Sequence, residues 1–321
     1  MTFAGSPDRV EARLVPDLGY EFDAFAVSGL PRRPGRQLVR AVVRALTAPL
    51  ACRRILRRRR PDAVLGAGGY VAGPMVLAAR LSGIPCALTE ADAHLGLANR
   101  LAAPLADRVF LALPLGLHGE KYEAVGRPIP AASRAMDRSE ARSKLGLAED
   151  ARVVLVFGGS LGARLLNDVA LDAWAEAGPA VIHLCGERDY PELEGRVVRH
   201  DYILRPFMDE IGVAYGASDL ALARAGGSVW ELAAAGLPAV LVPGAFATGR
   251  HQEKNARWFV DAQGAVVVPE DEAARAPQVV EGLLGDPDRL AAMATAMRVV
   301  AKPNAAEEIA DELVSLAAAR R

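Results

Sequence analysis

The chain has few cysteines, no long apolar run and no excess of charge of either sign, and each shortage excludes a class of protein. Cys52, Cys86 and Cys185 stand far apart in 321 residues, which fits neither a disulfide framework nor a zinc site and favours a reducing cytoplasm. No apolar run reaches the roughly eighteen residues that cross a bilayer. The formal net charge of −1 gives no general attraction to nucleic acid. We therefore expect no disulfide scaffold, no membrane span and no nucleic-acid partner.

What the chain does contain is apolar core material in alternating segments. Apolar residues make up 51% of the sequence, and the length suits two domains of ordinary size. Strand-like runs such as DAVLGAGG, RVVLVFGG and DLALARAGG alternate with helix-like runs. This alternation predicts α/β domains, each with a parallel sheet covered by helices.

A polar segment after residue 130 interrupts the alternation and marks a domain boundary. We predict a first Rossmann-like domain at 1–132, a linker at 133–150, a second Rossmann-like domain at 151–303 and an amphipathic helix at 304–321. Two such domains in sequence suggest a cleft between them. Ligands of open α/β sheets bind beyond the carboxyl ends of the strands, so the glycine turns that follow strands are the first candidate sites.

Two of these turns together suggest a nucleotide. Residues 158–162, GGSLG, join a strand to a helix, so they form either a phosphate site of backbone N–H groups with the Ser160 hydroxyl or a tight turn without a ligand. Residues 225–228, AGGS, follow another strand and precede Glu231. Glu231 either accepts the two hydroxyls of a ribose or only stabilises its helix. One turn for phosphate and one for sugar would hold a nucleotide.

Five stretches that cover nearly the whole chain carry a resemblance. They are SPDRVEARLVPDLGYEFDAFAVSGL, PDAVLGAGGYVAGPMVLAARLSGIPCALTEADAHLGLANRL, VLVFGGSLGARLLN, RPFMDEIGVAYGASDLALARAGGSVWELAAAGLPAVLVP and HQEKNA. In this order they resemble the MurG family of GT-B-fold glycosyltransferases. The resemblance implies transfer of N-acetylglucosamine, with inversion, from UDP-N-acetylglucosamine to undecaprenyl-pyrophosphoryl-muramoyl-pentapeptide in peptidoglycan synthesis. It implies neither a cofactor nor a metal ion, and the D-x-D sequence Asp286-Pro287-Asp288 is typical of a helix N-cap.

The resemblance places the donor in the second domain. It implies that Ser160 contacts the diphosphate, that the main chain of Met208 contacts the uracil, and that Glu231 holds the ribose. Gln252 and Asn255 would face the N-acetylglucosamine hydroxyls, since amides pair well with hydroxyls. The remaining donor-binding residues that the family pattern implies are Gly159, Gly162, Ala225, Gly226, Gly227 and Ser228.

The acceptor lipid would bind the first domain. The stretch GAGGYVAGP is similar to the family's second glycine loop, and LTEADAHLGLANR aligns with its HEQN-x-x-x-GLTNR motif. Thr89, Ala91 and Asp92 replace the expected His, Gln and Asn, and Asp92 puts an anion near a pyrophosphate. The family glutamate, implied to be catalytic, is Glu90. The acceptor-binding residues implied are Gly68, Gly69, Tyr70, Asp92 and Asn99.

Two further departures concern charge and the start of the chain. The family's GNPVR is GRPIP here, so Pro130 replaces an arginine and Arg127 supplies positive charge from a neighbouring position. The match begins at the end of the family's second strand, so the first domain is expected to be incomplete at its start. The implied general base lies in the family's GGTGGH loop, ahead of the first matched residue. Either the natural start lies upstream or the short form is genuine. His94 and His251 lie in cleft motifs and are the other candidates for the general base.

Residues 36–60 combine nine arginines with apolar residues at helical spacing. They form either a pair of surface helices with a solvated basic face or a surface that docks on anionic lipid headgroups, where each arginine contributes about 1 kcal/mol. Because the implied acceptor is a membrane lipid, we expect peripheral attachment to the cytoplasmic face of the cell membrane.

Two other functions fit the same motifs. A related glycosyltransferase acting on another lipid acceptor would share the donor site and differ in its product. A catalytically impaired paralogue would bind a UDP-sugar and turn nothing over.

Overall fold

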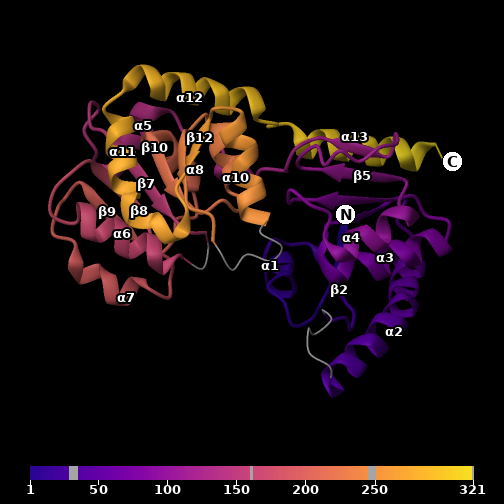
Figure 1. The fold of residues 1–321 in the computed structure, drawn as a ribbon. Helices are drawn as coiled ribbons and strands as arrows, with labels where there is room; N and C mark the ends of the chain where they lie inside the picture. The colour runs from indigo at the N-terminus through magenta and orange to yellow at the C-terminus, as the bar shows by residue number, and fades with distance from the viewer. Residues whose placement is uncertain (29–34, 160–161, 245–250, 320–321) are drawn as a thin grey trace. The chain divides into compact units, whose positions relative to one another are not determined.

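The protein is described by a computed structural model that covers residues 1–28, 35–159, 162–244 and 251–319 (Figure 1). It divides into two compact units, Met1–Gly126 with Ala305–Arg321, and Arg127–Asn304. This division differs from the expected one, because residues 127–150 belong to the second unit and the C-terminal helix belongs to the first.

The first unit contains two parallel sheets. The larger has the strand order β3-β4-β5-β6 and the smaller pairs β1 with β2. The strands are β1 (Thr2–Gly5), β2 (Glu21–Ala24), β3 (Val64–Gly66), β4 (Cys86–Glu90), β5 (Arg108–Leu111) and β6 (Tyr122–Ala124). The helices are α1 (Glu11–Asp17), α2 (Arg36–Arg59), α3 (Gly69–Leu81), α4 (Leu97–Ala102) and α13 (Ala305–Ala318), with a 3-10 helix at Ala103–Leu105.

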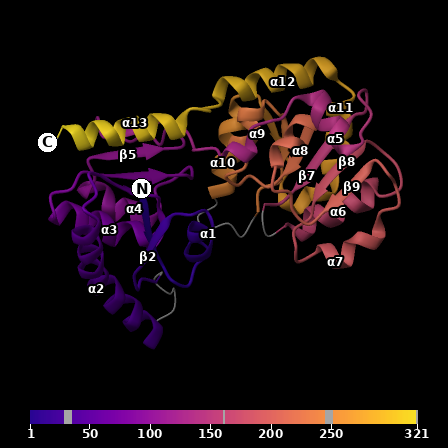
Figure 2. The ribbon, with the colours of Figure 1, turned by 180° about the vertical axis from the view of Figure 1, so that it is seen from behind.

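Both faces of the larger sheet are covered, as expected for parallel strands. On one face Leu88 and Val109 pack in a cluster with Val76 of α3 and Cys52 of α2. On the other face Ile309 of α13 packs with residues of β4 and β5, and α13 runs along β5 in both Figure 1 and Figure 2. The C-terminal helix belongs to the first unit because its apolar side covers one face of this sheet.

The second unit has one six-stranded parallel sheet with the order β12-β11-β10-β7-β8-β9. The strands are β7 (Val153–Phe157), β8 (Ala180–Leu184), β9 (Tyr202–Arg205), β10 (Leu220–Ala223), β11 (Ala239–Leu241) and β12 (Ala265–Val267). The helices are α5 (Arg138–Leu145), α6 (Arg164–Trp174), α7 (Tyr190–Leu193), α8 (Ile211–Ala217), α9 (Val229–Ala235), α10 (His251–Asp261), α11 (Ala276–Leu284) and α12 (Pro287–Val300). Short 3-10 helices lie at Ala131–Ser133, Glu194–Arg196 and Glu270–Arg275.

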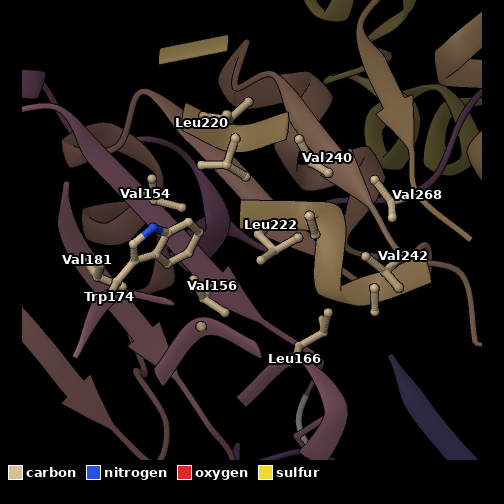
Figure 3. Close-up of a cluster of buried hydrophobic side chains, with 14 of the residues drawn as sticks. Val154, Val156, Leu166, Trp174, Val181, Leu220, Leu222, Val240, Val242 and Val268 are labelled. Atoms are coloured by element: carbon tan, nitrogen blue, oxygen red, sulfur yellow. The ribbon is translucent and has the colours of Figure 1, made fainter. Parts of the chain in front are cut away.

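One large core cluster of the second unit lies between this sheet and the helices on one of its faces. Figure 3 shows Val154 and Val156 of β7 beside Leu220 and Leu222 of β10, with Trp174 of α6 against them. All five residues of β7 are buried, because a central parallel strand has helices on both sides. The predicted α/β class and parallel sheets are confirmed in both units.

The strand order of the second unit contains a topological switch point at β7. From β7 the chain continues to β8 and β9 on one side and then returns to β10, β11 and β12 on the other. The connections that follow β7 and β10 therefore leave the same edge of the sheet in different directions. Such a point opens a crevice at the carboxyl ends of the strands, where ligands of this class of sheet bind.

Candidate functional site

The first glycine turn follows β7 and leads into α6. Ser160 and Leu161 lie outside the described residues, so the expected diphosphate contact of Ser160 stays a prediction. A Cβ added at Gly158 would lie 2.5 Å from the backbone nitrogen of Ala163. Gly159 and Gly162 have φ of +94° and +71°, which only glycine adopts readily. The turn therefore requires glycine at these positions, whether or not a ligand binds.

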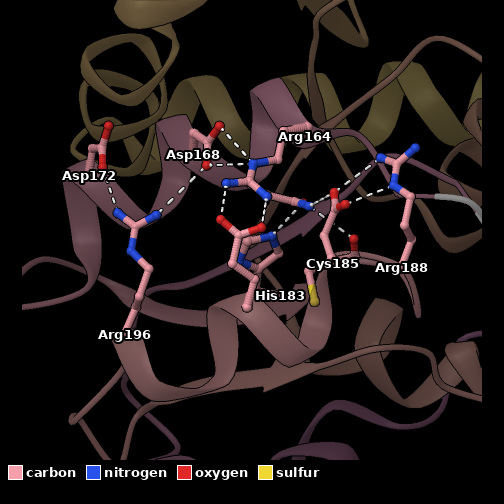
Figure 4. Close-up of polar contacts among 10 residues, drawn as sticks. Arg164, Asp168, Asp172, His183, Cys185, Arg188 and Arg196 are labelled. Atoms are coloured by element: carbon pink, nitrogen blue, oxygen red, sulfur yellow. Dashed lines mark hydrogen bonds and ion pairs between the residues drawn. The ribbon is translucent and has the colours of Figure 1, made fainter.

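A buried polar network lies behind this turn (Figure 4). Asn167 of α6 donates from Nδ2 to the Cys185 carbonyl and to Asp189, both at 2.9 Å. Its Oδ1 must then accept from Nε2 of His183 at 3.0 Å, which leaves Nδ1 to accept from the Tyr202 hydroxyl at 2.9 Å. Burial lowers the pKa of His183 to about 3. Asn167 thus fixes the start of α6 to the loop after β8, and the neutral His183 of β8 connects Asn167 to Tyr202 of β9.

Ion pairs on the surface strengthen the same connection. The Arg164 guanidinium bonds both carboxylate oxygens of Glu192 in α7, at 2.5 and 2.6 Å, and also pairs with Asp168 (Figure 4). The guanidinium of Arg188 lies 2.8 Å from Asp189 and holds the pKa of that carboxyl below its usual range. The helix that begins after the glycine turn is therefore held on both its buried and its exposed sides.

The second glycine turn, Ala225–Ser228, follows β10 and carries a cation. A Cβ added at Gly227 would lie 2.7 Å from Nη2 of Arg127, so the guanidinium rests directly on this glycine. Arg127 is half-buried, and among the described carboxylates none forms an ion pair with it. Its charge is available to an anion on the turn.

Glu231 lies on the first turn of α9, directly after this glycine turn. The Tyr215 hydroxyl donates to Oε2 of Glu231 at 2.7 Å. Tyr215 belongs to α8 and is buried, and its ring centroid lies 6.3 Å from that of Phe157, the last residue of β7. Burial, together with the charge of Glu231, raises the pKa of Tyr215, so the hydroxyl stays a donor. Tyr215 could not be singled out from the sequence, since an apolar helix with one tyrosine is ordinary core material.

The two amides of α10 contact main-chain groups of neighbouring loops. Oε1 of Gln252 accepts from the Gly244 nitrogen at 2.7 Å. Nδ2 of Asn255, which is 3% exposed, lies 3.4 Å from the Ala225 carbonyl. Both side chains thus support the carboxyl edge of the sheet. Their predicted contact with the sugar hydroxyls stays a prediction, as does the uracil contact of Met208, which is buried in the β9–α8 connection.

The expected acceptor loop joins β3 to α3. Gly68 and Gly69 have φ of +89° and +67°, a left-handed conformation that glycine permits. A Cβ at Gly68 would lie 3.5 Å from the Thr89 carbonyl, so this loop passes close to the end of β4. The Tyr70 hydroxyl accepts from Nε of Arg9 at 2.8 Å.

Glu90, at the end of β4, organises the loop that follows it. One carboxylate oxygen, Oε2, accepts from the Gly96 nitrogen and from Nδ2 of Asn99, both at 2.9 Å, and Oε1 lies 3.3 Å from the Asp92 nitrogen. Asn99 also donates to the Thr89 carbonyl at 2.9 Å. Glu90 and Asn99 are 9% and 3% exposed. The structure therefore brings Glu90, Asp92 and Asn99 together, with Glu90 bonded to the loop; its predicted catalytic role stays a prediction.

The arrangement in the second unit suits a nucleoside diphosphate. A glycine turn with a guanidinium on it can hold a pyrophosphate, and a carboxylate one helical turn further can hold a diol. Within the described ranges no three His, Cys, Asp or Glu side chains gather as metal ligands do. The sequence pointed to the two glycine turns and to Glu231 one by one, and the fold is what brings Arg127 to Gly227.

Two family descriptions match the chain. The glycosyltransferase family 28 N-terminal domain matches residues 2–111, and the glycosyltransferase family 28 C-terminal domain matches residues 153–313. Each match covers most of one structural unit.

Named relatives and a solved structure are similar over almost the whole chain. Proteins of Xanthomonas euvesicatoria and Mycobacterium bovis are each 40% identical, over 97% and 99% of this chain and 73% and 82% of their own length. Both are named UDP-N-acetylglucosamine--N-acetylmuramyl-(pentapeptide) pyrophosphoryl-undecaprenol N-acetylglucosamine transferase. The crystal structure of Acinetobacter baumannii MurG is 29% identical, with a TM-score of 0.78 over 98% of this chain and 90% of that one.

Proposed function

The chain belongs to glycosyltransferase family 28, and we propose that it transfers N-acetylglucosamine from UDP-N-acetylglucosamine to undecaprenyl-pyrophosphoryl-muramoyl-pentapeptide. This reaction is the one that names its 40% identical relatives. The observation that carries the proposal is the arrangement at residues 225–231. There a glycine turn and the carboxylate of Glu231 follow β10 at the switch point of the sheet, and the guanidinium of Arg127 lies against that turn.

The donor would bind across the carboxyl ends of β7 and β10. Gly226, Gly227 and Ser228, with Arg127, would hold the diphosphate, and Ser160 would approach it from the first glycine turn. Glu231 would accept the ribose hydroxyls, and the main chain at Met208 would contact the uracil. These positions follow from the family pattern, and the contacts among Arg127, Gly227, Tyr215 and Glu231 support them.

The chemistry requires stabilisation of the leaving diphosphate. The acceptor hydroxyl attacks the anomeric carbon, the bond to the diphosphate breaks with inversion, and negative charge grows on UDP. A guanidinium fixed in advance beside the diphosphate stabilises that charge without having to reorganise during the reaction. Arg127 would do so, and its half-buried position strengthens the interaction relative to bulk water.

In the first unit the acceptor pyrophosphate would lie against Gly68 and Gly69. The Tyr70 and Asn99 side chains flank this loop, and Glu90 fixes the segment that carries Asp92. Because Glu90 accepts hydrogen bonds from main-chain and amide N–H groups, it keeps the loop in shape whichever group removes the acceptor proton.

The protein would act at the cytoplasmic face of the cell membrane as a peripheral protein. The helices that the structure describes include none with the length and apolarity of a membrane span. On α2, a single helix rather than the pair considered above, Val43, Leu46 and Leu50 are 53%, 73% and 62% exposed at helical spacing, next to a basic C-terminal half. Apolar side chains beside arginines suit an anionic lipid surface.

Calorimetric titration with nucleotides tests the donor site. We expect UDP and UDP-N-acetylglucosamine to bind well and GDP to bind far more weakly. Glu231→Ala should weaken UDP binding by about tenfold, because a charge-assisted hydrogen bond contributes about 1.5 kcal/mol or more. Equal affinity for UDP and GDP would contradict the proposal.

A further inference from the structure

We propose that Tyr215 is a positioning residue that sets the orientation of Glu231 and, through it, the preference for a nucleotide with a ribose. The inference rests on the proposed function. It stands on one contact, the hydrogen bond of 2.7 Å from the Tyr215 hydroxyl to Oε2 of Glu231. Tyr215 would act through Glu231 and would not contact the nucleotide itself.

A glutamate that binds a diol needs a fixed carboxylate plane. Glu231 is half-buried on the first turn of a seven-residue helix, and its side chain has three rotatable bonds that lose freedom when they are ordered. A hydroxyl fixed in the core anchors one oxygen in advance, so less ordering remains when the nucleotide binds. The Tyr215 bond leaves Oε1 to receive one ribose hydroxyl and a second lone pair of Oε2 to receive the other.

Tyr215 is itself well fixed. It is 2% exposed, and its ring lies against Phe157 at the end of β7, directly before the first glycine turn. One buried ring therefore contacts both the strand that carries the expected diphosphate turn and the expected ribose carboxylate. The relative position of those two parts determines how a nucleoside diphosphate fits.

The proposal is tested by comparing UDP with 2′-deoxy-UDP on the full chain. Removal of the hydroxyl by Tyr215→Phe should weaken UDP binding about three- to tenfold. It should weaken 2′-deoxy-UDP less, because that nucleotide keeps only one of the two hydroxyls that Glu231 receives, so the preference for ribose falls. In transfer assays the KM for the donor should rise while kcat stays near that of the wild type. In a Glu231→Ala background, Tyr215→Phe should change neither affinity further, because the pair acts as a unit.

Tyr202→Phe is the matched control. Tyr202 is also a buried tyrosine of the second unit, and its hydroxyl bonds His183. Its loss should lower the unfolding temperature without changing the preference for ribose. Tyr215→Met, which also lacks the hydroxyl, provides a second variant if the phenylalanine variant does not fold.

The outcomes separate this inference from the proposed function. A wild type that binds no UDP would overturn both. The positioning role alone would be overturned by a folded Tyr215→Phe variant whose preference for ribose is unchanged. This holds if the wild type binds UDP and Glu231→Ala weakens that binding.

Discussion

The guanidinium of Arg127 occupies the space that a side chain at Gly227 would need, since a Cβ added there would lie 2.7 Å from Nη2. One hundred residues separate the two in sequence. Because Gly227 has no side chain, the Arg127 guanidinium can lie against the turn that precedes Glu231. Arg127 thereby provides positive charge at this turn, whereas Pro130 stands where the family has an arginine.

Gly227→Ala should therefore impair donor binding through Arg127. Gly227 has no left-handed φ, so the alanine strains no backbone and acts by pushing the guanidinium away. We expect the KM for UDP-N-acetylglucosamine to rise about tenfold or more with little loss of stability. Gly282→Ala is the control, because Gly282 lies on α11, outside the glycine turns, and a Cβ there meets nothing within 4 Å. Equal effects of the two substitutions would show that Arg127 is not involved.

Arg127→Ala should weaken binding of the diphosphate without weakening binding of the nucleoside. The affinity for UDP should fall roughly 10- to 100-fold, while that for uridine stays the same, because only the diphosphate carries charge. Calorimetry on both ligands measures this, and Arg127→Lys should restore part of the loss. A parallel loss of uridine binding would mean that the arginine acts on the fold of the turn instead.

The buried His183 should make stability depend on pH. Folded His183 stays neutral down to its pKa of about 3, whereas in the unfolded chain it binds a proton below about 6.5. Between these values the unfolded state holds more protons, so stability falls as pH falls. From pH 7.5 to 5.5 the free energy of unfolding should decrease by about 1.4 kcal/mol through this residue. Urea titration of wild type and His183→Gln checks it, since the variant should lack this part of the decrease.

The exposed apolar residues of α2 should bind membranes. In flotation with vesicles that contain anionic phospholipid, we expect salt-sensitive binding of the wild type, and more than tenfold weaker binding when Val43, Leu46 and Leu50 become serine. Leu81→Ser is the control, because Leu81 is 66% exposed on α3 of the same unit. Flotation that is absent, or unaffected by the triple substitution, would exclude this helix as the membrane contact.

Local patterns predicted local structure well in this chain. The Asp286-Pro287-Asp288 sequence was interpreted as a helix start, and Asp286 indeed caps α12 by accepting from the Arg289 nitrogen at 3.0 Å. Such features depend on neighbouring residues, whose geometry the sequence determines directly. The resemblance to the MurG family is likewise confirmed by the relatives and by the solved structure.

Long-range partners could not be predicted in the same way. The apolar face of residues 304–321 showed that this helix packs, but not that Ile309 would meet the sheet of the first unit. Tyr215 and Glu231 are 16 positions apart with a strand, β10, between them, so no helical spacing connects them. Periodicity tells which side of an element is buried, whereas strand order decides what covers it.

Transfer of labelled N-acetylglucosamine from UDP-N-acetylglucosamine to an undecaprenyl-pyrophosphoryl-muramoyl-pentapeptide acceptor tests the central claim most directly. Wild type and Gly282→Ala should give one labelled product that carries a single added sugar, and Gly227→Ala and Glu231→Ala should form it far more slowly. Binding of UDP without transfer to this acceptor would contradict the proposed reaction. It would favour a protein that only binds the donor or a transferase that uses another lipid.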